Sequence, residues 1–143
     1  MFLLGETVGK YQILANLGSG GFGTVFLARD TWIDKKVAIK VPHRQSGDSD
    51  ELLQEPRLLA ALDHPNIVSI LTAERANGTF FIVMEYVKGE TLEAVLDREK
   101  SLDVPRALTY AVRQSAGAAN IGSNSDPPTT RATMRIADLR RQT

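Results

Sequence analysis

The feature that most constrains this chain is a cluster of glycines between residues 17 and 25, where the sequence reads Leu-Gly-Ser-Gly-Gly-Phe-Gly-Thr-Val. Glycine reaches backbone angles that are closed to other residues, and without a side chain it lets the main chain approach a ligand closely. Several backbone N–H groups can then converge on one anion, usually a phosphate. Two unrelated nucleotide-binding folds use Gly-x-Gly-x-x-Gly, so the residues that follow the glycines decide between them.

Those residues predict a strand. In a dinucleotide-binding unit the glycines open a helix, and an acidic residue appears roughly 20 positions later. Residues 24–28 instead read Thr-Val-Phe-Leu-Ala, a β-branched and aromatic run with no helix cap before it. The glycines are therefore expected at the tip of a hairpin between two strands. Lys36–Val41 is predicted as the next strand, and it contains Lys40.

The order strand, glycine tip, strand, then Val-Ala-Ile-Lys resembles the ATP-binding half of a protein kinase. The resemblance covers residues 11 to about 115 and is greatest to bacterial serine/threonine kinases. It implies an α+β fold: a kinase-like small lobe with a five-stranded antiparallel sheet and one helix, then one or two helices of a truncated large lobe and a disordered tail. The implied divisions are an N-terminal extension at 1–10, the small lobe and hinge at 11–87, large-lobe helices at 88–116 and a disordered or aberrant tail at 117–143.

Lys40 is the first candidate functional residue. Its neighbours Ala38 and Ile39 are apolar, so its side chain would cross a covered region, and a buried ammonium needs a carboxylate or phosphate nearby. The alternative is an edge-strand lysine whose ammonium reaches water. Glu55 lies on the apolar face of a helix predicted at 51–62. The resemblance implies that Lys40 and Glu55 form the ion pair that lets the lysine reach the α- and β-phosphates, whereas the alternative is a local pairing of Glu55 with an arginine.

Pro56 interrupts that predicted helix. Proline inside a helix removes one backbone hydrogen bond and clashes with the carbonyl four residues earlier. We expect the helix either to start late, near Gln54, or to kink at Glu55. Either outcome would loosen the element that positions Glu55.

Two further strands are predicted at Ile67–Ala76 and Thr79–Val83, joined by Asn-Gly, the strongest short hairpin signal. The segment after them resembles the kinase hinge. That resemblance implies Met84 as the gatekeeper at the back of the pocket, and main-chain groups of Glu85 and Val87 on the adenine edge. The alternative is a plain buried strand that ends in a turn.

The resemblance implies ATP as the cofactor, with Mg²⁺ in the family. The implied cofactor-binding residues come from the glycine stretch, the neighbouring strands and the hinge: Leu17, Gly18, Ser19, Gly20, Gly21, Phe22, Gly23, Val25, Ala38, Lys40, Met84, Glu85 and Val87. No metal ligand is assigned. His43 is expected in a loop and is given no function.

Two helices are expected after the hinge. Thr91–Asp97 forms a short amphipathic run that Thr91 would cap, and a second helix has Asp103 near its start and Pro105 in its first turn. The following residues, 117–133, are small, polar and proline-bearing, which indicates disorder.

A kinase should next show His-Arg-Asp with a later asparagine, and then Asp-Phe-Gly. Neither string occurs. Ala119-Asn120-Ile121 and the run Met134–Asp138 are similar to fragments of those segments. A lost catalytic-loop segment, a shifted reading frame and coincidence stay open as explanations.

Composition excludes several classes of function. A formal net charge of zero argues against nucleic-acid or membrane-surface partners, and the absence of cysteine excludes disulfides, thiol catalysis and cysteine-rich zinc sites. The first residues lack the pattern of a signal peptide, and no apolar run reaches the length of a membrane span. We therefore expect a cytoplasmic protein.

Four functions remain open. The chain could be the ATP-binding lobe of a serine/threonine kinase without catalysis of its own, or a working kinase. It could also be a pseudokinase-type interaction module or a nonfunctional kinase fragment. The expected partners are ATP and either a protein substrate or a partner kinase.

Overall fold

The computed structural model describes residues 2–43, 45 and 49–121. The chain divides into two compact units. The first contains Met1–Ala61 and Ser69–Tyr86, and the second contains Leu62–Val68 and Val87–Thr143. Each unit is described below by itself.

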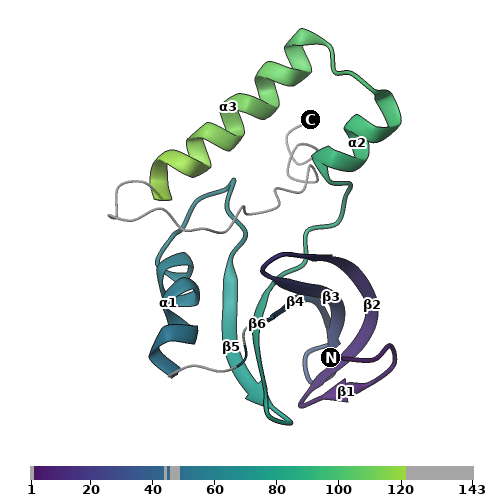
Figure 1. Ribbon diagram of the computed structural model, residues 1–143, viewed down its shortest axis with the longest axis vertical. Coiled ribbons are helices and arrows are strands. Elements are labelled where there is room, and N and C mark those ends of the chain that lie inside the picture. Colours follow the sequence, from purple (N-terminus) through teal and green to yellow (C-terminus); the bar gives the residue numbers. More distant parts are fainter. Residues whose placement is uncertain (1, 44, 46–48, 122–143) are drawn as a thin grey trace. The chain divides into compact units, whose positions relative to one another are not determined.

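The first unit is built on one sheet, in which every neighbouring pair of strands is antiparallel (Figure 1). The strand order is β1-β2-β3-β4-β6-β5. The strands are β1 (Thr7–Val8), β2 (Tyr11–Gly20), β3 (Gly23–Asp30), β4 (Lys35–Pro42), β5 (Ile70–Ala76) and β6 (Thr79–Glu85). The helix of this unit, α1 (Ser49–Ala60), lies beside β5 (Figure 1). The predicted α+β small-lobe architecture is confirmed.

The sheet has six strands where the sequence predicted five. The additional strand is β1, in which Val8 pairs with Tyr11 across a turn at Gly9, whose φ is +60°. Residues assigned to an N-terminal extension thereby reach the core: Phe2 is 6% exposed and Val8 is fully buried. A two-residue strand carries no periodicity of its own, so the sequence gives no local signal for it.

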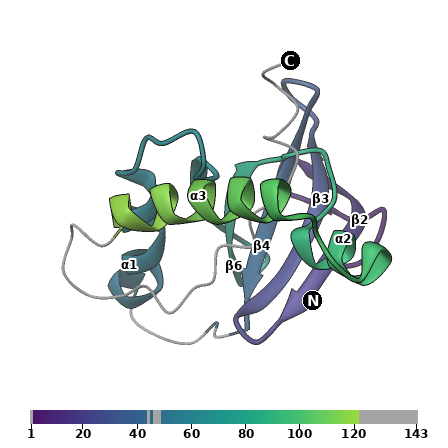
Figure 2. The same ribbon diagram turned by 90° about the horizontal axis from the view of Figure 1, so that it is seen from above.

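The core lies on the inner face of a strongly curved sheet (Figure 2). Tyr11 on β2 donates a hydrogen bond of 2.8 Å to Glu74 Oε1 on β5, although these strands are far apart in the strand order. The Tyr11 ring also meets Phe81 edge-on at 6.0 Å between centroids. The sheet therefore closes upon itself. The buried core cluster contains Phe2, Val8, Tyr11, Ile13, Phe26, Ala28, Val37, Ile39, Phe81 and Val83.

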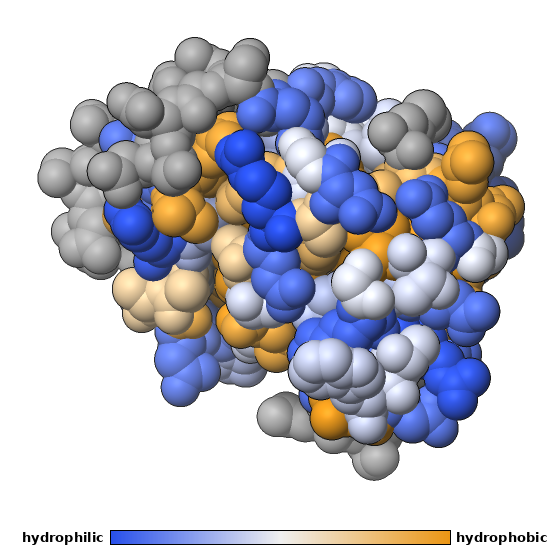
Figure 3. Space-filling view, turned by 90° about the horizontal axis from the view of Figure 1, so that it is seen from below, coloured by the Kyte–Doolittle hydropathy of each residue, from blue (hydrophilic) through white to orange (hydrophobic). Residues whose placement is uncertain are grey.

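Hydrophobic side chains also reach the surface of this unit. Leu3, Leu4, Trp32 and Ile33 are each at least 67% exposed. Figure 3 shows hydrophobic side chains in separate groups between hydrophilic ones. Single exposed apolar residues are normal on a folded protein.

The hairpin between β5 and β6 forms as predicted. Asn77 and Gly78 both have positive φ, +51° and +75°, and the flanking residues Ala76 and Thr79 pair across the turn. The predicted start of β5 is wrong by three residues, because the strand begins only at Ile70. Ile67 instead donates its N–H to the carbonyl of His64.

Helix α1 begins two residues before Glu51, where the predicted helix started, and the alternative of a kink at Glu55 stays a prediction. It runs from Ser49 to Ala60 with a buried Pro56 inside it, so the prediction of a late start near Gln54 is wrong. The helix also ends before Leu62, which was expected in its last turn. Proline costs one intrahelical hydrogen bond, but its buried ring contributes apolar contact.

The second unit contains α2 (Leu92–Glu99), which Thr91 caps as predicted, and α3 (Val104–Ile121), which begins next to Asp103. The Thr91 hydroxyl accepts the Ala94 N–H at 3.1 Å, and Asp103 Oδ1 accepts the Arg106 N–H at 2.9 Å. Side-chain oxygens at these positions satisfy N–H groups that have no partner within the helix. Helix α3 includes residues 117–121, which the sequence assigned to the tail, and the rest of that tail lies outside the described residues.

Candidate nucleotide-binding site

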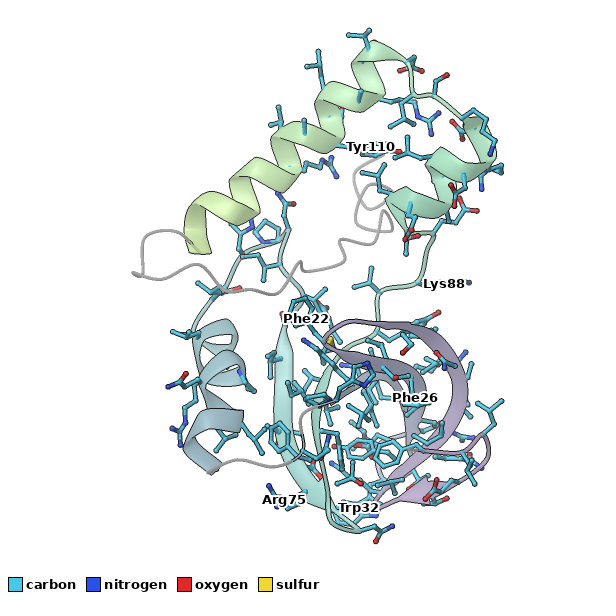
Figure 4. The ribbon with its side chains drawn as sticks, in the orientation of Figure 1. Phe22, Phe26, Trp32, Arg75, Lys88 and Tyr110 are labelled. Atoms are coloured by element: carbon cyan, nitrogen blue, oxygen red, sulfur yellow. The ribbon has the colours of Figure 1, made fainter. Side chains whose placement is uncertain are left out.

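The glycine stretch forms the predicted hairpin tip. Gly20 pairs with Gly23, so β2 and β3 are joined by a turn of only two residues, Gly21 and Phe22. Figure 4 shows Phe22 at this turn and Trp32 at the opposite end of the sheet. Phe22 is 55% exposed, so it contributes little to the core.

The structural reason for glycine differs among the positions of the hairpin. A Cβ on Gly23 would lie 2.4 Å from the Val41 carbonyl oxygen, and the φ of Gly23 is +155°. Gly18 has the same φ, but a Cβ there would meet nothing within 4 Å. Gly20 and Gly21 have neither a positive φ nor a close neighbour. Packing within the protein therefore explains Gly23, but it does not explain glycine at 20 and 21.

Polar side chains hold the two arms of the hairpin. The Gly18 N–H donates to Asn16 Oδ1 at 2.8 Å, and the hydroxyls of Ser19 and Thr24 lie 2.9 Å apart across the strands. Strand β2 carries irregularities in register next to this region, between Asn16 and Gly18, and Leu17 lies in that irregularity. These contacts shape the hairpin immediately before its turn.

Strand register places four of the predicted site residues on one face of the sheet. Val25 on β3 is opposite Lys40 on β4, and Ala38 on β4 is opposite Met84 on β6. Alternate residues of a strand point to opposite faces. Since Val37 and Ile39 point into the core, Ala38 and Lys40 point away from it. Ala38 is 6% exposed, and Lys40 is half-buried.

The pairing of Lys40 with Glu55 stays a prediction. Glu55 lies within α1, but its side chain is outside the described part of the chain. Strand β4 and helix α1 belong to the same compact unit. The structure thus gives the backbone position of Glu55 and leaves the partner of its carboxylate open.

The hinge segment begins as the end of β6. The Glu85 N–H donates to the Ser69 carbonyl at 3.0 Å, and Glu85 Oε1 accepts the Ser69 N–H at 3.0 Å. Any main-chain contact of Glu85 with a ligand would therefore use its carbonyl. Val87 is 7% exposed and belongs to the second unit.

An electrostatic cluster secures the other end of β3. Asp30 Oδ2 lies 3.0 Å from Lys10 Nζ, and Asp30 Oδ1 accepts the N–H groups of Trp32 and Ile33 at 3.0 and 3.3 Å. Burial works against the ionised carboxylate, but these hydrogen bonds hold the pKa of Asp30 below its ordinary value of 3.8. The cluster fixes the β3–β4 turn, at the far end of β3 from the glycines.

The described residues contain no cluster of side chains that would hold a metal ion without a bound nucleotide. Mg²⁺ prefers carboxylate and other hard oxygen ligands. Within 2–43, 45 and 49–121 there is no group of three or more His, Cys, Asp or Glu side chains that could hold a metal ion. Of the segments similar to kinase metal-binding motifs, Asn120 is in α3 with its side chain undescribed, and Asp138 lies outside the described residues.

The curved antiparallel sheet, the glycine hairpin and β4, the strand that carries Lys40, together form a small lobe of the protein-kinase type. The model of the protein kinase domain family matches residues 11–121. The chain therefore belongs to the protein kinase family.

Curated relatives of this chain include bacterial serine/threonine kinases. The chain is 38% identical over 111 residues to serine/threonine-protein kinase PrkC of Bacillus subtilis, an alignment that covers 74% of this chain and 17% of PrkC. It is 40% identical over 92 residues to serine/threonine-protein kinase pkn2 of Myxococcus xanthus, which covers 62% of this chain and 11% of pkn2. The chain thus spans less than a fifth of either relative.

Solved structures show the same fold. The kinase domain of Mycobacterium tuberculosis PknI superimposes with a TM-score of 0.68 at 22% identity, covering 87% of this chain and 53% of that one. No helix in the described ranges is long and apolar enough to cross a bilayer.

Proposed function

We propose that this chain is the ATP-binding portion of a serine/threonine protein kinase and does not transfer phosphate by itself. The observation that carries the proposal is the glycine hairpin. At Gly20 and Gly21 no protein atom lies where a Cβ would stand, so glycine there leaves room for a ligand to approach the main chain. The main-chain N–H groups of the hairpin are suited to bind phosphate oxygens.

The other predicted residues would complete the ATP site. Lys40 would bind the α- and β-phosphates and pair with Glu55. Val25, Ala38 and Met84, which share a sheet face with Lys40, would cover the adenine, while the Glu85 carbonyl would accept a hydrogen bond from it. Leu17 would cover the same ring from the β2 side. Main-chain N–H groups of Ser19 to Gly23 would hold the phosphates.

Catalysis would need more than this chain offers. In kinases an aspartate orients the attacking hydroxyl, and Mg²⁺ neutralises the developing charge on the phosphates. No His-Arg-Asp or Asp-Phe-Gly string occurs in the sequence, so it offers no counterpart of the catalytic aspartate and none of the metal-binding aspartate in its motif. The residues present would therefore bind and orient ATP without activating an acceptor. A protein substrate remains a prediction from the family, and a cytoplasmic location remains a prediction from the sequence.

Thermal unfolding in the presence and absence of Mg-ATP tests the proposal. A ligand at 100 times its Kd stabilises the folded state by about 2.7 kcal/mol. We expect this stabilisation in the unaltered chain and its loss in Lys40→Met. Lys36→Met is the matched control, because Lys36 is an exposed lysine on the same strand and should keep the full response.

Two outcomes would contradict the proposal. An equal response to ATP in Lys40→Met and Lys36→Met would show that Lys40 does not bind the nucleotide. Transfer of labelled phosphate to a generic protein acceptor above the level of a no-enzyme blank would show that the chain is a working kinase.

A second candidate is an interaction module of the pseudokinase type that binds a partner kinase. The observation in its favour is an exposed apolar stripe on α3, where Val104, Leu108 and Val112 are 60–70% exposed at four-residue spacing. Residues at this spacing lie on one helix face. A chain that unfolds cooperatively but gains no stability from Mg-ATP would favour this candidate.

A further inference from the structure

His43, to which the sequence analysis gave no function, contacts the glycine hairpin through its side chain. Its Nε2 lies 2.7 Å from the Gly20 carbonyl oxygen. A carbonyl oxygen can only accept, so Nε2 must carry the proton and donate. The His43 backbone N–H also donates to the Phe22 carbonyl, at 3.4 Å. One residue thus holds carbonyls on both sides of Gly21.

The position of His43 directly after β4 explains why its side chain, and not only its backbone, donates to the turn. The ladder between β3 and β4 ends at the pair of Gly23 and Pro42. Proline has no N–H and cannot donate to the ladder. The next residue, His43, supplies both a backbone and a side-chain donor to the turn beyond.

The chain on either side of His43 is bonded to the sheet through Gln45. Gln45 donates from Nε2 to the carbonyls of Pro42 and Phe80, at 2.6 and 3.2 Å, and its Oε1 accepts the Phe80 N–H at 2.7 Å. These bonds tie the segment after β4 to β6. The hairpin tip is therefore connected through His43 to the central strands of the sheet.

We propose that His43 is a positioning residue that orients the Gly20–Gly21 peptide for phosphate binding, an inference that rests on the proposed ATP-binding function. In a trans peptide the carbonyl of one residue and the N–H of the next point in opposite directions. Holding the Gly20 carbonyl toward His43 therefore turns the Gly21 N–H away from it. A carbonyl that rotated toward a phosphate would repel it, so a fixed peptide keeps the donor available.

The test compares His43→Phe, which keeps a ring but loses the donor, with His43→Gln, which keeps a side-chain N–H. Both variants retain the backbone bond to Phe22. One hydrogen bond corresponds to an affinity change of about 2- to 12-fold. We expect His43→Phe to raise the Kd for ATP by that factor and His43→Gln to restore it to within about twofold.

A second measurement does not depend on ATP. The NMR order parameter of the Gly21 amide in the free protein should fall in His43→Phe and recover in His43→Gln. An unchanged order parameter in His43→Phe overturns the inference, as does a Gln variant that behaves like Phe. If the unaltered chain does not bind ATP, the proposed function fails, and the order parameter alone decides whether His43 holds the turn.

Discussion

Replacing single glycines of the hairpin by alanine should separate glycines that the fold requires from glycines that only a ligand requires. The structure predicts an order of destabilisation in which Gly23→Ala is most severe, Gly18→Ala is intermediate and Gly20→Ala is harmless. Gly23 combines a φ of +155° with a Cβ position 2.4 Å from the Val41 carbonyl oxygen. Gly18 has only the unfavourable φ, and Gly20 has neither.

The magnitudes follow from these two causes. A residue with a side chain in a glycine-only backbone region costs about 1–3 kcal/mol, and forcing a methyl group into packed structure costs about 1–3 kcal/mol more. Gly23→Ala should therefore lower the free energy of unfolding by roughly 2–6 kcal/mol, and Gly18→Ala by about 1–3. Gly20→Ala should range from no change to a gain of about 1 kcal/mol, because alanine restricts the unfolded chain.

Chemical denaturation of the three variants measures these differences, and thermal unfolding provides a second readout. For a unit of this size 1 kcal/mol corresponds to about 4–8 °C in Tm, so the Tm of Gly23→Ala should fall by at least about 8 °C. Finding Gly23→Ala as stable as Gly20→Ala would refute the steric reasoning. If Gly23→Ala does not fold, the difference in stability between Gly18→Ala and Gly20→Ala still tests the predicted cost of placing alanine at a positive φ. Gly20→Ala should also bind ATP more weakly despite its intact fold.

Three further predictions concern the framework. Tyr11→Phe removes the hydrogen bond to Glu74 that closes the sheet and should cost about 1–3 kcal/mol in urea unfolding, while a loss below 0.3 would show that the bond contributes nothing. Because folding lowers the pKa of Asp30, its stabilisation is present above pH 4 and is lost as pH falls through the folded pKa. The Tm difference between the unaltered chain and Asp30→Asn should accordingly be larger at pH 7 than at pH 2.5, and a constant difference would contradict this assignment. Gln45→Ala should speed hydrogen exchange at the Phe80 amide, and unchanged exchange would mean that another group protects that amide.

Local features of the fold could be predicted from the sequence because short segments encode them. The glycine hairpin, the Asn77-Gly78 turn and the cap at Thr91 each depend on the backbone preferences of a few adjacent residues. The glycines and the lysine-bearing strand together also indicated the kinase family. Where local signals conflicted, as at Pro56, the prediction left two alternatives, and the late start near Gln54 is wrong.

Contacts between residues distant in sequence were decided only by the tertiary structure. Register placed Val25, Lys40 and Met84 on one sheet face, and curvature brought Tyr11 to Glu74, 63 residues away. Strand periodicity predicts which residues alternate, but it cannot fix the register between strands. The role of His43 has the same origin, since its partner Gly20 lies 23 residues earlier and becomes its neighbour only when β3 and β4 pair.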